Sequence, residues 1–392
     1  MPSAVVETLI AFLRLGLTAF GGPVAHLSYF RAEFVECRKW VGEAAYADII
    51  ALCQFLPGPA SSQVAIILGL ARAGWLGAAA AWIGFTLPSA LLLALFALGV
   101  ASLGAPPGAA HGLKIVAVAV VAQAVWSMAK TLCPDPARAS LAVASAALAL
   151  GFPSTLTQLT IIAAGAIFGW RLIAVDATQP HAPLPLPQIP RQAAFVALAL
   201  FAALLVGLPT YAGGHALRLF EIFFRSGALV FGGGHVVLPL LQQAIVPHGY
   251  ITNDAFLAGY GAAQAVPGPL FAFAAYLGAA MWPEPNGLVG AALCLFAIYL
   301  PSFLLLAGVL PFWEELRRKR AMQAALKGVN AAVVGLLGAA LYAPVFTSAI
   351  FAPLDLAAAL VAYLLLVFWK APPFAVVALG ALAGALLPLA TG

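Results

Sequence analysis

The chain has 392 residues, of which 64% are hydrophobic and only 8% are charged. Soluble domains carry about a quarter charged residues, so this composition excludes a soluble enzyme, a disordered chain and a nucleic-acid-binding domain. The long apolar runs also exclude an outer-membrane barrel, whose strands alternate polar and apolar residues. The sequence therefore predicts an all-α polytopic membrane protein, with the net charge of +5 placed in loops beside anionic lipid headgroups.

Stretches with little or no charge follow one another along the chain. Those long enough to cross about 30 Å of hydrocarbon are 73–113, 139–170, 192–217, 285–313, 328–354 and 356–392. Proline recurs between residues 176 and 191, which indicates an extended linker. We therefore expect a first repeat at 1–175, a linker at 176–191, and a linking helix with a second repeat at 192–392.

Several landmarks recur in the same order in the two halves. The FGG motif of residues 20–22 recurs at 231–233. The PGP motif of residues 57–59, which follows Gln54, recurs at 267–269, where it follows Gln264. A Leu-Pro-Ser motif and a Leu-Lys pair recur further along at nearly the same offset. These repeats indicate an internal duplication.

The basic residues favour opposite orientations for the two halves, because lysine and arginine concentrate in short cytoplasmic loops. Residues 31–39 carry three basic side chains, whereas the matching stretch 241–250 carries none. The bias reverses further along, where residues 102–112 carry none and the matching loop carries four at 317–320. We therefore predict inverted-topology repeats, related through one extra crossing near residues 193–208, as in secondary transporters.

The FGG and PGP motifs interrupt apolar runs and leave segments of about 11 or 12 residues, which are too short to cross a bilayer. In the first half these segments are 9–20, 24–34, 46–56 and 60–71. Unpaired backbone groups at membrane depth are costly unless they line a cavity or meet other protein groups. The sequence thus predicts discontinuous or re-entrant helices whose tips meet in the middle of the bundle.

The tips are candidates for anion binding, because helix N-termini carry free N–H groups and positive potential. Pro59 is suited to begin a helix, with two serine hydroxyls and an amide directly after it. In the alternative interpretation, the PGP motif only shapes the bundle, the serines cap the helix, and Gln54 and Gln264 pin the broken backbone. The predicted substrate contacts at the tips are Phe20, Gly21, Gly22, Gln54, Pro57, Gly58, Pro59, Ser61, Ser62, Gln63, Gly232, Gly233, Gly234, Gln264 and Gly268.

Two arginines and three titratable groups complete the candidate site. Arg14 and Arg225 stand at equivalent positions before the two FGG motifs. Their guanidinium groups match a dianion, whereas in the alternative each side chain reaches for the membrane interface. His26, His235 and Asp48 are candidates for carrying a coupling proton, with a structural, hydrogen-bonded role as the alternative for the histidines.

No metal or cofactor is predicted, because the four scattered cysteines show no metal-ligand spacing. The chain also shows no HExxH, Gly-x-Ser-x-Gly or P-loop motif, so we expect a transporter and not an enzyme.

Residues around these motifs extend the pattern. The first half reads Phe20-Gly21-Gly22-Pro23, then His26 and Glu33-Phe34, followed by an unbroken stretch from Cys53 to Gln63. The pattern continues through 72–75 and 84–89, and the second half adds 231–235 and 267–269. Together these motifs resemble the chromate ion transporter family in its long, two-domain form, over essentially the whole chain.

The resemblance implies a multi-pass protein of the bacterial inner membrane that exports chromate, driven by the proton motive force, with sulfate as a structural mimic. Its partners would be this tetrahedral oxyanion and the lipid bilayer, and a homodimer is one option for its oligomeric state. Alternating access of two inverted halves is the expected mechanism. The alternatives are uptake of sulfate or another oxyanion, and proton-independent anion exchange.

Overall fold

The computed structural model describes residues 3–103, 107–173, 189–210, 213–231, 234–316 and 319–386. In these ranges all regular secondary structure is helical, which confirms the predicted all-α class. Five helices are long and apolar enough to cross a membrane: Ala60–Val100, Gly108–Leu132, Arg191–Thr210, Gly287–Leu316 and Arg320–Phe346. Helices suit a bilayer because each satisfies its backbone hydrogen bonds within one segment. The predicted linker at 176–191 lies almost entirely outside the described residues.

Short helices flank the first FGG and PGP motifs, as the sequence predicts. Helix α1 (Ala4–Thr18) is followed by α2 (Gly22–Phe30), which continues as a π-helix, η1 (Arg31–Cys37). Helix α3 (Glu43–Phe55) leads to the PGP motif, after which α4 (Ala60–Leu103) begins. The 13 residues of α3 span about 20 Å, which is less than the hydrocarbon thickness of a bilayer.

Helix α4 is itself divided at Ala73 and Gly74, whose backbone leaves helical geometry. The chain turns back at this point, because Gly69 and Gly77 pack so closely that a Cβ on either would overlap the carbonyl of the other. The short segment 60–72 therefore lies against the start of a long helix that begins at Trp75.

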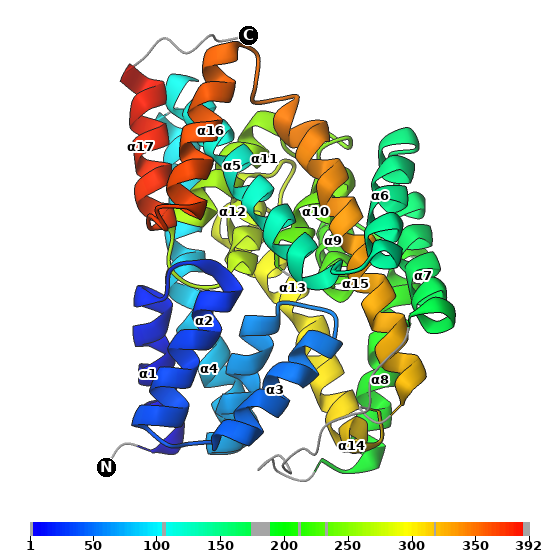
Figure 1. Cartoon of the computed structure of the whole chain (residues 1–392). Coiled ribbons are helices and arrows are strands. Elements are labelled where there is room, and N and C mark those ends of the chain that lie inside the picture. The colour runs from blue at the N-terminus through cyan, green and yellow to red at the C-terminus, as the bar shows by residue number, and fades with distance from the viewer. Residues whose placement is uncertain are drawn as a thin grey trace.

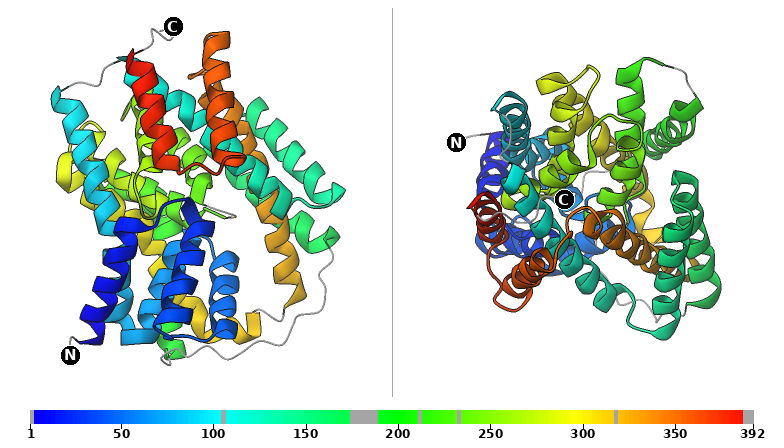
Figure 2. Two further views of the ribbon diagram at one scale, coloured as in Figure 1. Left: turned by 60° about the vertical axis from the view of Figure 1, so that its left-hand side comes forward. Right: turned by 90° about the horizontal axis from the view of Figure 1, so that it is seen from above.

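The second half follows the same order of short and long helices. Its elements are α9 (His215–Ala228), η3 (Gly234–Val236), α10 (Val237–Ile245), α11 (Asn253–Ala265), η4 (Leu270–Ala272), α12 (Phe273–Ala280) and α13 (Gly287–Val309). Gly278 and Gly290 approach each other as closely as Gly69 and Gly77 do, so α12 turns back onto α13. Figure 1 and the left view of Figure 2 show α1–α3 in the lower part of the molecule and α9–α12 in the upper part.

The remaining helices surround these elements (Figure 1). They are α5 (Pro107–Leu132), α6 (Pro136–Gly151), α7 (Thr155–Leu172), α8 (Arg191–Gly207), η2 (Leu208–Thr210), η5 (Leu310–Phe312), α14 (Trp313–Leu316), α15 (Arg320–Ala340), η6 (Leu341–Phe346), α16 (Pro353–Val367) and α17 (Pro373–Leu386). Small residues let membrane helices approach closely, and α15 meets α7 through Gly165, Gly169 and Gly328. Helices α16 and α17 form a hairpin on α5, where Gly112 meets the backbone of Gly380.

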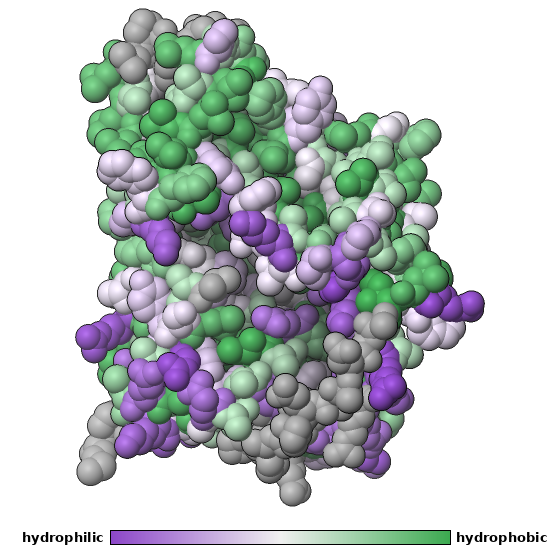
Figure 3. All heavy atoms as spheres, in the orientation of Figure 1, coloured by the Kyte–Doolittle hydropathy of each residue, from purple (hydrophilic) through white to green (hydrophobic). Residues whose placement is uncertain are grey.

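The outer surface suits a lipid environment. Figure 3 shows hydrophobic side chains over most of the upper part of this face, with hydrophilic side chains at the lower end and across the middle. Helix α8, which occupies the place of the predicted extra crossing, carries large exposed apolar side chains such as Phe195 and Val206. Exposed apolar surface of this extent is stable against hydrocarbon and not against water.

Two backbone hydrogen bonds join the halves at their helix breaks. Gly58 N–H, in the first PGP motif, donates to the Val230 carbonyl at 2.7 Å, just before the second FGG motif. Gly268 N–H, in the second PGP motif, donates to the Ala19 carbonyl at 2.9 Å, just before the first FGG motif. We call these the crossed hydrogen bonds. They satisfy polar groups that the helix breaks would otherwise leave unpaired in the interior.

Only glycine fits both positions of the PGP motifs. Gly58 has a φ of +123° and Gly268 a φ of +101°, in the left-handed region where other residues are strained. A Cβ on Gly58 would lie 2.5 Å from Gln63 Nε2 and 2.8 Å from Ser302 Oγ. A Cβ on Gly268 would lie 2.9 Å from Ser89 Oγ. The two Leu-Pro-Ser motifs therefore pack against the PGP motifs of the opposite half.

This packing predicts that Gly58→Ala and Gly268→Ala lower the thermal unfolding midpoint in detergent more than Gly249→Ala does. Gly249 also has positive φ, at +74°, but no atom lies within 4 Å of its added Cβ. The Gly249→Ala variant should therefore lose only the cost of backbone strain, about 1–3 kcal/mol, without any steric overlap. Equal shifts for the three variants would show that the crossed contacts are not tightly packed.

Candidate functional site

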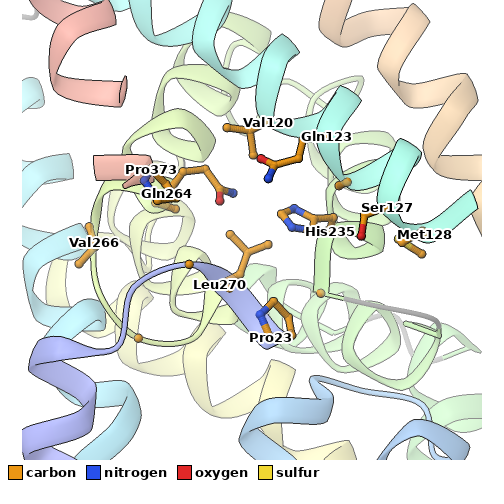
Figure 4. A pocket seen from close by; sticks show the side chains of 16 residues that line it. Pro23, Val120, Gln123, Ser127, Met128, His235, Gln264, Val266, Leu270 and Pro373 are labelled. Carbon is orange, nitrogen blue, oxygen red and sulfur yellow. The ribbon is translucent and has the colours of Figure 1, made fainter. Parts of the chain in front are cut away.

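A cavity of about 330 Å³ lies where the helix tips of both halves meet (Figure 4). Its walls come from the start of α2, the middle of α5, η3, the end of α11, the second PGP loop and the start of α17. Four polar side chains face it: Gln123, Ser127, His235 and Gln264. Of the described residues that line it, His235 alone is titratable, so the cavity offers dipoles and no lysine or arginine.

Gln264 presents a donor to this cavity. Gln264 is the last residue but one of helix α11, just before the second PGP motif, and its Nε2 atom is buried. That atom makes no hydrogen bond to any of the described residues. A buried amide donor without a partner is costly, so this N–H group is suited to a ligand that enters the cavity.

His235 presents a second donor. Its Nδ1 atom lies 2.7 Å from the hydroxyl of Tyr260, which is fully buried. A buried hydroxyl needs an acceptor, and this ring nitrogen is the one that the described residues offer it. Donation to Nδ1 places the proton of the neutral imidazole on Nε2, where it is available to the cavity.

Backbone groups add to these donors. Gly21 and Gly22 line the cavity at the beginning of helix α2, and Pro23 occupies its first turn. The first N–H groups of a helix have no acceptor within it and carry partial positive charge. The cavity therefore collects neutral donors from both halves, which is the chemistry that binds an oxyanion.

Helix α5 contributes Gln123 and Ser127, which the sequence analysis did not single out. The two residues are four positions apart and so share one face of the helix. They are polar residues within an otherwise apolar run, and this spacing is the signal that would have found them. Pro373, at the start of α17, also lines the cavity without any motif that predicted it.

The residues after the first PGP motif contact protein groups and do not line the cavity. Ser61 Oγ lies 3.4 Å from His26 Nδ1, and Ser62 Oγ lies 3.4 Å from the Tyr299 hydroxyl. Gln63 Nε2 donates to the Pro57 carbonyl at 2.7 Å. Pro57, Gly58 and Pro59 are likewise outside the cavity lining. The two serines thus contact α2 and α13 and not the N-terminus of α4 that the alternative has them cap, and the substrate contacts assigned to this motif stay predictions.

His26 is held by bonds on both ring nitrogens. Its Nε2 lies 3.2 Å from the Ala19 carbonyl, which can only accept, so this nitrogen donates. The Ser61 hydroxyl then donates to Nδ1. Ala19 is also the acceptor of the Gly268 N–H, so His26 supports one of the crossed hydrogen bonds. Its role as a proton carrier stays a prediction.

Other predicted residues lie at or beyond the edge of the cavity. Phe20 packs against Phe374 of α17, with ring centroids 4.8 Å apart. Gly234 and Gly268 line the cavity, whereas Gly232 and Gly233 lie outside the described residues. Gln54 is exposed on α3, and Asp48 is buried on the same helix without lining the cavity.

Neither predicted arginine lines the cavity. Arg14 is exposed on α1. Arg225 pairs with the buried carboxylate of Glu221 at 3.1 Å, one turn earlier on α9. Within the described residues, no group of three His, Cys, Asp or Glu side chains is placed to hold a metal ion.

Broken helices, an apolar exterior and a polar central cavity together define a multi-pass helical membrane protein of the transporter type. The family model described as chromate transporter matches residues 6–170 and 217–385. The chain therefore belongs to the chromate transporter family, which confirms the resemblance of its motifs.

Relatives match over most of their length. The chromate transport protein of Pseudomonas aeruginosa is 29% identical over 347 residues, which cover 86% of this chain and 80% of that protein. The chromate transport protein of Cupriavidus metallidurans is 28% identical over 384 residues, which cover 96% of this chain and 92% of that protein. An uncharacterized transporter of Methanocaldococcus jannaschii is 27% identical over 342 residues, which cover 86% of this chain and 83% of that protein. No solved structure matches this chain.

The geometry predicts that water-soluble reagents reach the cavity. In a variant without its four native cysteines, Gln123→Cys should react with a small hydrophilic thiol reagent, because its side chain faces the cavity. Ser145→Cys, buried against Gly335 between α6 and α15, is the control and should stay unmodified. Mass spectrometry measures the labelled fraction of each variant. Equal labelling of Gln123→Cys and Ser145→Cys would contradict a cavity open to water.

Proposed function

We propose that this protein is a secondary transporter that exports chromate across the bacterial inner membrane in exchange for protons. The observation that carries the proposal is the central cavity of neutral donors, among them Gln264 Nε2, which has no hydrogen-bond partner in the described part of the chain. The family and the names of its relatives support chromate as the oxyanion and a transporter in place of an enzyme.

Neutral donors suit a transported dianion. Chromate loses strong hydration on entering a protein, so it needs several N–H and O–H groups in compensation. The amides of Gln123 and Gln264, the His235 Nε2–H and the Ser127 hydroxyl supply them, beside the first turn of α2. A transporter must also release its substrate, and a site without a fixed cation binds less tightly than one with an arginine.

We further propose that residues 1–175 and 192–392 form inverted repeats that alternate access to this cavity. Helices α1–α3 of the first half approach the centre from the lower part of Figure 1, and their second-half counterparts α9–α12 approach it from the upper part. The opposite loop charges of the two halves support the same interpretation. Rocking of one half against the other about the crossed hydrogen bonds would open the cavity to each side in turn.

The cavity lining predicts which substitutions stop transport. Gln264→Leu and Gln123→Leu should each lower chromate flux into proteoliposomes by about tenfold or more, since a hydrogen bond to a charged group is worth about 1.5–3 kcal/mol. Gln243→Leu is the matched control, because this glutamine lines a separate cavity. Arg14→Gln should also retain flux. Loss of flux in Arg14→Gln with normal flux in Gln264→Leu would place the anion elsewhere.

Proton exchange predicts a dependence of flux on the pH gradient. Proteoliposomes with an imposed gradient should accumulate radiolabelled chromate in one direction, and a protonophore should abolish the accumulation. Excess sulfate should compete, because it shares the tetrahedral shape and double charge of chromate. Equal flux with and without the gradient would favour proton-independent anion exchange instead.

A further inference from the structure

A buried acid–base pair joins α5 to α16, away from the residues that line the anion cavity. His111 Nε2 lies 3.1 Å from Asp355 Oδ1, and the two side chains are 5% and 0% exposed. The other carboxylate oxygen of Asp355 accepts the N–H groups of Phe351 and Ala352 at 3.0 Å each. Asp355 therefore both caps α16 and binds this helix to α5.

A second charged pair lies one turn further along α5. Lys114 Nζ donates to Asp254 Oδ1 of α11 at 3.0 Å. The ring of Phe351 lies between the two pairs, stacked on His111 at 5.8 Å and 5.7 Å from Lys114 Nζ. Lys114 is nearly buried, with 8% of its side chain exposed, whereas Asp254 is 69% exposed.

The charges of these four groups balance only when His111 carries a proton. Two carboxylates and one ammonium leave one negative charge, and the proton on His111 neutralises it. A buried carboxylate without a counter-charge is costly, so a proton on His111 would stabilise the ionised form of Asp355. Among the described residues, the other titratable or charged groups on α5, α16 and the helices packed against them are Lys130, Tyr260, Arg320, Lys327, Tyr342 and Tyr363.

The pair joins α5 to a hairpin whose tip borders the central cavity. Helix α16 leads directly into α17, whose first residue, Pro373, lines that cavity, and whose next residue, Phe374, packs on Phe20. A separate cavity of about 390 Å³ lies between α5, α16 and α17, and its lining is entirely apolar. Helix α17 packs closely on α5 at Gly112 and Gly380, whereas α16 is separated from α5 beside this cavity and is joined to it by the polar His111–Asp355 pair.

We propose that His111 and Asp355 form a proton-binding pair that positions the α16–α17 hairpin against the anion cavity. With the proton bound, the ion pair holds α16 on α5 and the hairpin tip on Phe20. Without it the attraction weakens and the tip loosens. This inference rests on the proposed function only in treating the central cavity as the anion site.

Hydrogen–deuterium exchange of the whole protein in detergent tests the anchor without any transport. The comparison is wild type against His111→Gln at matched pH values between about 5 and 8. In the wild type, exchange of residues 364–376, corrected for its intrinsic pH dependence, should rise by about fivefold or more with rising pH. In His111→Gln, exchange of the same residues should be fast at every pH tested. His248→Gln, an exposed histidine elsewhere, is the control and should behave as wild type.

Asp355→Asn provides the second variant, because its amide oxygen retains an acceptor for the cap of α16 while the charge is lost. It should show the same fast exchange as His111→Gln. A pH response that persists in either variant, or is absent from the wild type, would overturn the proposal. Chromate flux distinguishes this result from the proposed function: pH-dependent exchange without any flux in the wild type would support the anchor and contradict the transporter.

Discussion

The constraint on which this architecture depends is the need to satisfy broken backbone inside a membrane protein. Each PGP motif leaves an N–H group without a helical partner, and the chain pairs it with a carbonyl at the FGG motif of the opposite half. Glycine is required at both donors because its φ is positive and the neighbouring serine leaves no room for a Cβ. The crossed hydrogen bonds thus hold the two sets of tips together and leave the cavity beside them.

The same requirement decides how polar side chains are used. Ser61, Ser62 and His26 stand beside the first tip, and their polar atoms bond to one another or to neighbouring helices. The second tip differs, because apolar residues follow its PGP motif and because Gln264 Nε2, just before that motif, makes no hydrogen bond to the described residues. The cavity nevertheless draws its lining equally from the two halves, with eight residues from each.

The fold was largely predictable, whereas the site was predictable only in part. The Pro-Gly-Pro motifs at 57–59 and 267–269 interrupt their helices because proline lacks an N–H donor and glycine adopts positive φ, and both effects are local. His235 and Gln264 were found because they adjoin such motifs. Gln123 and Ser127 were missed because α5 carries no motif, and only its packing against α11 brings them to the cavity.

The sequence by itself determined the membrane class, the helical elements, the positions of the breaks and the duplication, because composition and local steric preference act within short segments. Only the tertiary structure decided which polar groups face the cavity, which are satisfied by other helices, and that His111 meets Asp355. Those outcomes depend on contacts between residues far apart in the chain, where burial and the geometry of the available partner determine the role of each side chain.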